Sequence, residues 1–190
     1  MRSARLFAAV SFTPGEKRGL EETTRDFRSR GASGRFVAPE LFHITLHFFG
    51  QTDLALLPAI EAAMRQTAAR HRPFTMVTDR AGSFGRDGRA VLWLGIGQGA
   101  KELTALQADL ERALAAQGFP IETKPFKAHI TVARDGAFPK ELSALALPET
   151  RLACPAITLM ESTAGNGPLR YVPLLTIPLS SDNEFNEDQQ

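Results

Sequence analysis

The chain has 190 residues, of which 43% are hydrophobic and 23% are charged, and this composition excludes a fibrous or disordered protein. The formal net charge of +1 conceals an asymmetry. Residues 180–190 contain four acidic residues and no basic one, so the rest of the chain carries +1 − (−4) = +5. We expect residues 1–180 to form one domain and residues 181–190 to be an acidic disordered tail.

The single cysteine, Cys154, excludes an intramolecular disulfide, and we interpret it as a small core residue in a reducing compartment rather than a nucleophile. Two arginines before the apolar run 6–10 give the N-terminus a faint resemblance to a signal peptide, but the run is too short. No stretch approaches the length of a membrane span. These features predict a cytoplasmic protein.

Strands and helices alternate along the sequence. Runs of β-branched and aromatic residues predict the strands, and apolar residues at helical spacing predict the helices. In chain order we expect a strand over 5–11, a helix over 16–30, a strand over 42–50, a helix capped by Thr52 or Asp53, strands over 74–80 and 90–96, a helix over 101–117, and strands over 128–132, 156–161 and 171–177. Loops are expected over 31–39 and around Pro139 and Pro148. No glycine-rich nucleotide loop opens a helix, which disfavours a Rossmann or P-loop fold.

A repeated tetrapeptide carries the clearest functional signal. His-Ile-Thr-Leu at 43–46 returns as His-Ile-Thr-Val at 129–132. Alternate side chains of a strand share a face, so His43 lies beside Thr45 and His129 beside Thr131. A pair of imidazoles can supply an acid and a base near neutral pH, and a hydroxyl beside each can hold a phosphoryl oxygen. The repeat indicates phosphate-ester chemistry without a metal.

The apolar residues between the polar ones, Ile44, Leu46 and Phe48, are expected to face a core. The two motifs are 129 − 43 = 86 residues apart, about half of the ordered body, which suggests two similar lobes that share a cleft. The alternative is that both histidines are ordinary strand residues. It would leave two histidines and two threonines on strand faces without a shared polar purpose.

The other two histidines have different expected roles. His47 follows His43 by four residues, which raises the possibility of zinc, but the segment reads as a strand with no adjacent Glu and no evident third ligand. We predict no metal site. In a strand His47 shares the face of His43 and Thr45, so we expect it to line the cleft rim and contact the substrate without taking part in catalysis. His71 ends a helix and is expected to be solvated there.

Several cations and aromatic residues near the motifs are further candidates. Arg134 and Lys127 flank the second motif, where they either attract phosphate or sit at a solvated strand end. Arg35 and Phe36 pose the same choice upstream of the first motif. The aromatic candidates for stacking on a base, with core packing as the alternative, are Phe49 and Phe84.

At these residues the chain resembles the two-histidine phosphoesterase superfamily, and within it the RNA 2′,3′-cyclic phosphodiesterases, once described as 2′-5′ RNA ligases. The resemblance extends over most of the body, at 5–10, 35–50, 82–84 with 91–95, 126–134, and 161–162 with 170–171. The chain departs from the family pattern in having Phe36 where Trp is frequent, and Gly85 and Ala128 where Pro is frequent.

The resemblance implies an α+β, bilobal fold with two pseudo-symmetric lobes and antiparallel sheets around a central cleft. It implies no metal or cofactor, and RNA ends or nucleotides with a 2′,3′-cyclic phosphate as the partner. We also expect a monomer with no obligate protein partner. Water would open the ring to a 2′-phosphate, with His129 as the general base and His43 as the acid for the 3′ oxygen. Thr45 and Thr131, with Arg134, would bind the phosphate.

Alternative functions remain open. They are a reversible 2′-5′ RNA ligase, a phosphodiesterase for another cyclic or 2′-5′-linked nucleotide, and a non-catalytic nucleotide-binding module. An idle module would tolerate loss of a motif residue, whereas this sequence retains both His and both Thr. The sequence therefore favours an enzyme.

Overall fold

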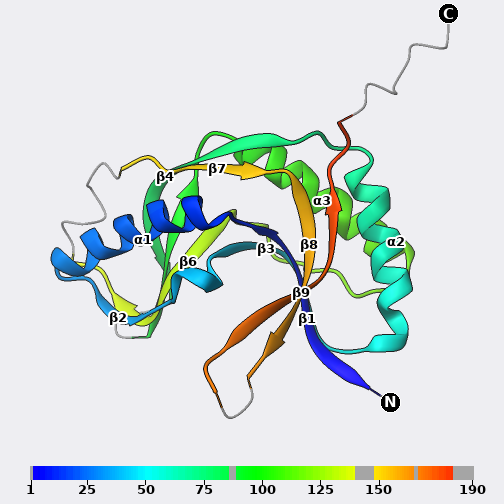
Figure 1. Ribbon diagram of the computed structural model, residues 1–190, viewed down its shortest axis with the longest axis horizontal. Helices are drawn as coiled ribbons and strands as arrows, with labels where there is room; N and C mark the ends of the chain where they lie inside the picture. The colour runs from blue at the N-terminus through cyan, green and yellow to red at the C-terminus, as the bar shows by residue number, and fades with distance from the viewer. Residues whose placement is uncertain (1, 86–88, 140–147, 165–166, 182–190) are drawn as a thin grey trace, which may run out of the picture.

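Two antiparallel sheets make up the fold in a computed structural model that describes residues 2–85, 89–139, 148–164 and 167–181 (Figure 1). The four-stranded sheet consists, in spatial order, of β3 (His43–Asp53), β1 (Ser3–Ser11), β8 (Ala156–Thr163) and β9 (Arg170–Pro178). The five-stranded sheet consists of β2 (Ser33–Phe36), β6 (His129–Ala137), β5 (Ala90–Ile96), β4 (Phe74–Phe84) and β7 (Arg151–Cys154). Only Pro155 separates β7 from β8, so the chain passes from one sheet to the other at this residue.

Each sheet contains one copy of the repeated motif. Counted from the motif strand, the spatial orders are β3-β1-β8-β9 and β6-β5-β4-β7, with β2 added on the other side of β6. The predicted α+β bilobal architecture is confirmed. The lobes do not follow the two halves of the sequence, however, because the four-stranded sheet is built from both ends of the chain and the five-stranded sheet mostly from its middle.

Within the part of the chain that the structure describes, three α-helices flank the sheets: α1 (Pro14–Ser29), α2 (Leu57–Ala68) and α3 (Ala100–Ala116). In Figure 1, α1 lies to the left with the five-stranded sheet and α2 to the right with the four-stranded sheet. The start of α1 is fixed by a capping box, in which Thr13 accepts from the Glu16 N–H and the Glu16 carboxylate accepts from the Thr13 N–H. Two short 3₁₀ helices cover Pro39–Leu41 and Leu54–Leu56, and Asp53 caps the second.

Buried apolar residues from both sheets and all three helices form one core. Burial of this surface stabilises the two lobes as one unit. Cys154 belongs to this core with no exposed surface, and burial raises the pKa of its thiol to about 12. The prediction of a core cysteine is therefore confirmed. None of the helices in the described ranges is long and apolar enough to span a bilayer.

The structure adds two strands that the sequence did not suggest: β2, which lies inside the loop predicted over 31–39, and β7, which lies between Pro148 and the strand predicted over 156–161. Both have only four residues, and β2 includes a glycine, Gly34, at φ +127°. A Cβ at Gly34 would lie 2.7 Å from the Cα of Gly136, so only glycine permits this close approach of β2 to β6. The predicted tail lies outside the described residues, apart from Ser181.

The first motif strand also differs from the prediction. β3 does not close at Gly50 but continues to Asp53. Ala8 pairs with His47 and Ala9 with Thr45, so Leu46 is an extra residue in a β-bulge. The bulge shifts the alternation, and His47 is buried while Phe48 is 52% exposed. The expectations that His47 shares the face of His43 and that Phe48 faces the core were both wrong.

Candidate active site

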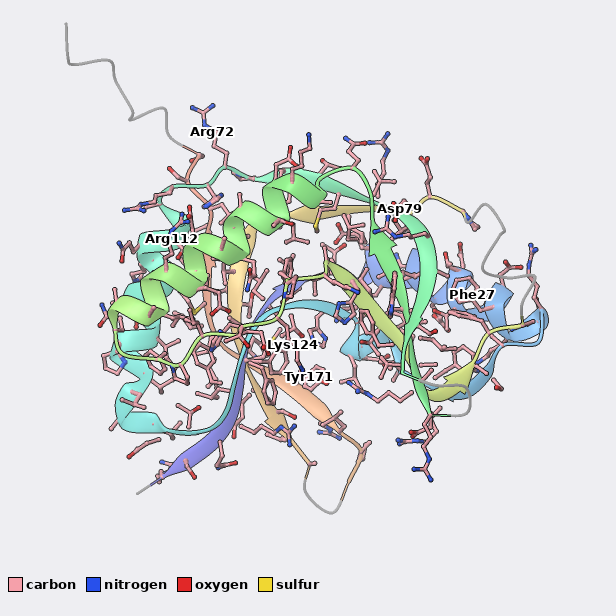
Figure 2. The ribbon with its side chains drawn as sticks, turned by 180° about the vertical axis from the view of Figure 1, so that it is seen from behind. Phe27, Arg72, Asp79, Arg112, Lys124 and Tyr171 are labelled. Carbon is pink, nitrogen blue, oxygen red and sulfur yellow. The ribbon has the colours of Figure 1, made fainter. Side chains whose placement is uncertain are left out.

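The two motif strands come from different sheets and line one cavity. Its volume is about 580 Å³, and its lining includes the four motif side chains, His43, Thr45, His129 and Thr131. Tyr171 belongs to the same lining, and Figure 2 shows it near the middle of the molecule. We refer to this cavity as the catalytic cleft.

Each motif histidine is held in the same way by the backbone. His43 Nδ1 lies 2.7 Å from the Leu41 carbonyl oxygen, and His129 Nδ1 lies 2.6 Å from the Lys127 carbonyl oxygen. A carbonyl oxygen only accepts hydrogen bonds, so both Nδ1 atoms carry a proton. This leaves Nε2 of each ring for a ligand, and Nε2 of His43 is 2.9 Å from Thr45 Oγ1.

Aromatic rings fix the position of both imidazoles. The ring of His43 lies 5.0 Å from that of Phe7 and 5.1 Å from that of Tyr171. The ring of His129 meets Phe84 edge-on at 5.0 Å. Such packing restricts ring rotation and removes water from each imidazole. The cleft therefore presents two pre-oriented imidazoles.

Burial also controls the charge of the two imidazoles. It lowers the pKa of His43 to about 4; the hydrogen bond to Leu41 opposes this shift, and the positive charges of Arg134 and Lys17 act in the same direction as burial. The pKa of His129 is lowered as well, first by burial and then by Arg134, against the hydrogen bond to Lys127. Near neutral pH the cleft therefore presents two neutral imidazoles.

Arg134 and Phe84 were predicted near the site, and both line the catalytic cleft. Lys127 places Nζ 5.5 Å from the centre of the Phe84 ring. The sequence analysis missed Arg5 and Phe7, which also line the cleft. They alternate with buried Leu6 in β1, and this alternation was a signal for a cleft-facing pair.

The lining of the catalytic cleft does not include five other candidates, namely Lys127, His47, Arg35, Phe36 and Phe49. The exposed Arg35 side chain pairs with Asp135 at 2.9 Å, which is a contact between β2 and β6. The ring of Phe36 lies 4.2 Å below the guanidinium of Arg28. The ring of Phe49 packs at an angle against two other rings, 4.5 Å from His47 and 5.6 Å from Phe119.

The remaining histidines pair with acids. His47 Nδ1 is 2.8 Å from Glu111 Oε1, and the side chain of His47 is 5% exposed. His71 Nε2 is 2.8 Å from Asp109 Oδ2 at 14% exposure, so the expectation of a solvated His71 was wrong. The sequence could not show this pairing because Asp109 lies on a different helix.

The zinc alternative finds no support in the geometry. The β-bulge at Leu46 removes His47 from the face of His43, and the Nδ1 atoms of both rings are already hydrogen bonded. Within the described ranges, no three or more side chains of His, Cys, Asp and Glu are grouped so that they could hold a metal ion.

Paired His-x-Thr strands on two sheets, each with its Nδ1 atom tied to a carbonyl, define the class of two-histidine phosphoesterases. The sequence profile of the 2′-5′ RNA ligase superfamily matches residues 19–166. The chain therefore belongs to this superfamily, and within it to the family of RNA 2′,3′-cyclic phosphodiesterases.

Two relatives show the extent of the match. The RNA 2′,3′-cyclic phosphodiesterase of Escherichia coli is 32% identical over 176 residues, which is 90% of this chain and 93% of the relative. The enzyme of the same name from Geobacillus stearothermophilus is 30% identical over 188 residues, which is 94% of this chain. The chain spans only 60% of the length of that second relative.

Solved structures agree with this assignment. E. coli LigT complexed with 3′-AMP superposes with a TM-score of 0.76 at 27% identity, over 94% of this chain and 99% of that one. Kluyveromyces marxianus Usb1 has a TM-score of 0.57 at 11% identity, over 93% of this chain and 98% of that one. The similarity to Usb1 extends to the fold alone.

Proposed function

We propose that the protein hydrolyses the 2′,3′-cyclic phosphate at RNA ends to a 2′-phosphomonoester, without a metal ion. The observation that carries this proposal is the pair of Nδ1-anchored imidazoles that reach one cleft from two sheets. In-line displacement at phosphorus needs a base and an acid on opposite sides, and two pseudo-symmetric motifs supply them. The names of the relatives support the same reaction.

In this mechanism His129 is the general base and His43 the general acid. Nε2 of His129 takes a proton from water as the new P–O bond forms. Nε2 of His43 gives a proton to the 3′ oxygen as the P–O3′ bond breaks. Thr45 and Thr131 donate to the non-bridging oxygens, and Arg134 balances their charge.

The low pKa of His43 does not prevent it from acting as the acid. Its imidazole is buried in the cleft, and the charges nearby are positive. A bound phosphodiester brings a negative charge to the same place, which favours the imidazolium and raises the pKa of His43. We infer that His43 takes up its proton together with the substrate.

The proposal is tested by assaying the four nucleoside 2′,3′-cyclic phosphates with EDTA present. Conversion to nucleoside monophosphates at an unchanged rate in EDTA is the expected result. Loss of activity in EDTA that added zinc or manganese restores would contradict a metal-free mechanism. Turnover of 2′-5′-linked dinucleotides alone would indicate that the protein is a phosphodiesterase for that linkage instead. Joining of RNA ends alone would indicate a ligase.

We further propose that the protein acts as a monomer in the cytoplasm. Its only cysteine is an unpaired, buried thiol, which suits a reducing compartment. The mass of the purified protein in solution, measured by light scattering, tests the monomer.

A further inference from the structure

A second cavity adjoins the catalytic cleft. It has a volume of about 830 Å³ and lies between β3 and the segment that follows α3, residues 118–128. Thr45, Phe48, Phe84 and His129 line both cavities, so the second cavity opens beside the motif side chains. Figure 2 shows Lys124 on this segment, near the middle of the molecule. We refer to this cavity as the flanking groove.

The catalytic cleft alone is large enough for one nucleotide. Its volume of about 580 Å³ is within the range of roughly 300–1,000 Å³ of pockets that bury a small ligand. The flanking groove is larger than the cleft and is not needed for a mononucleotide. The combined space fits a longer ligand.

The lining of the groove suits a nucleotide. Phe48 is 52% exposed where the two cavities meet, and Ile121 is 50% exposed on the opposite wall. Lys124 and Lys127 supply positive charge. Apolar and aromatic faces next to cations are the surface that single-stranded nucleic acid uses, with stacked bases and paired phosphates.

Two carboxylates also line the groove, but both already accept hydrogen bonds from the protein. Glu111 accepts from Gln107 Nε2 at 3.0 Å and from the Glu122 N–H at 3.3 Å, and its Oε1 lies 2.8 Å from His47 Nδ1. Glu122 accepts from the Lys124 N–H at 3.1 Å. Through Glu111, these hydrogen bonds hold the segment 118–128, which forms one wall of the groove, against α3 and β3 before any ligand binds.

We propose that the flanking groove binds the nucleotide immediately 5′ of the one that carries the cyclic phosphate. The cyclic phosphate occupies both the 2′ and the 3′ oxygens, so the RNA continues only through the 5′ oxygen of the terminal nucleotide. This inference rests on the proposed function and makes it more specific, since it assigns a binding site to the second nucleotide of the RNA end.

The test compares kcat/KM for cytidine 2′,3′-cyclic phosphate with that for a dinucleotide ending in the same group. One stacked base adds roughly 5- to 100-fold in affinity, so we expect the dinucleotide to be preferred by about that factor. Hydrolysis of the mononucleotide reports on the proposed function, and the ratio of the two substrates reports on the groove. Equal efficiency for both substrates would overturn the groove proposal and leave the proposed function intact.

Two variants localise the effect. Ile121→Ala and Lys124→Ala, which alter residues outside the lining of the catalytic cleft, should each lower dinucleotide kcat/KM about 3- to 10-fold and leave the mononucleotide within about twofold. Leu56→Ala, at 44% exposure, and Lys101→Ala are matched controls that lie outside both cavities. An unchanged ratio in both test variants would overturn the proposal.

Binding decides the question if neither substrate is hydrolysed. Calorimetry then compares cytidine 3′-phosphate with a dinucleotide 3′-phosphate. Tighter binding of the dinucleotide, lost in Ile121→Ala, supports the groove even though the proposed function has failed. Equal binding of the two ligands rejects the groove as well.

Discussion

Replacing either motif histidine with alanine tests whether both imidazoles, one as the acid and one as the base, are needed for catalysis. His43→Ala and His129→Ala should each lower turnover of a 2′,3′-cyclic phosphate by about 10² to 10⁴, the usual contribution of a positioned acid or base. His71→Ala is the control, because its partner Asp109 lies outside the cleft, and it should change turnover little. Steady-state kinetics on the three variants measures this. Near-wild-type turnover in either motif variant would remove the two-histidine mechanism.

The buried His43 should also make the fold sensitive to acid. Its pKa is about 4 in the folded protein, against an ordinary value of 6.5. As the pH falls below 6.5, the unfolded chain takes up a proton here that the folded protein refuses. Stability is therefore present above pH 6.5 and is lost as the pH falls toward 4, by about 3 kcal/mol in all. Urea titrations at several pH values measure the loss.

His43→Gln serves as the reference, because it removes this titration and keeps a polar side chain. Between pH 6.5 and 4 the unfolding free energy of the variant should fall less than that of the parent. Parallel curves for the two proteins would contradict the low pKa of His43.

At the level of single residues, the sequence placed the four motif side chains in one cavity because the two-residue period of a strand is readable locally. It did not find the positions of His47 and Phe48. These positions depend on a bulge in the pairing of β1 with β3. The register between two strands cannot be predicted from the sequence of one strand alone.

At the level of elements, Glu111 connects α3, β3 and the wall of the flanking groove. Glu111→Ala removes the acceptor of the Gln107 and Glu122 hydrogen bonds and leaves His47 buried without its partner. The free energy of unfolding should fall by about 1–3 kcal/mol. Urea denaturation measures it, with Glu102→Ala on the exposed face of the same helix as a control. A Glu111→Ala protein as stable as the parent would show that the segment 118–128 keeps its position without this carboxylate.

The long elements were predictable because their periodicity extends over many residues. The predicted strand over 90–96 and the helix over 101–117 agree with β5 and α3 to within one residue at either end. β2 and β7 could not be found, since four residues carry too little pattern. Their formation depends on partners far along the chain, β6 for one and β4 for the other.

At the level of the whole molecule, the uneven charge predicts a role for the tail. The four acids after residue 180 oppose a body of +5, so they compete with phosphates for its basic surface. Deletion of Ser181–Gln190 should leave the melting temperature unchanged and tighten RNA binding at low salt. Calorimetry and binding titrations at two salt concentrations measure this. A large drop in melting temperature on truncation would show that the tail is docked.

The lobes, too, are a property of the whole chain. The motif repeat correctly suggested two lobes. It did not show that the chain returns to the first sheet near its C-terminus, where β8 pairs with β1. Such long-range pairing leaves no local trace in the sequence, and it brings Tyr171 beside His43 at 5.1 Å. The residues that complete the site from the C-terminal strands were therefore the hardest to predict.

The identity of the product tests the central claim most directly. An RNA that ends in a 2′,3′-cyclic phosphate is treated with the enzyme, and phosphorus NMR compares the monoester with 2′- and 3′-phosphate standards. His43 can protonate only the oxygen within hydrogen-bond reach of Nε2. We predict a 2′-phosphate, formed with EDTA present and absent with His43→Ala. A predominantly 3′-phosphate product would mean that the substrate lies the other way round between the histidines, and would contradict the roles assigned to His43 and His129.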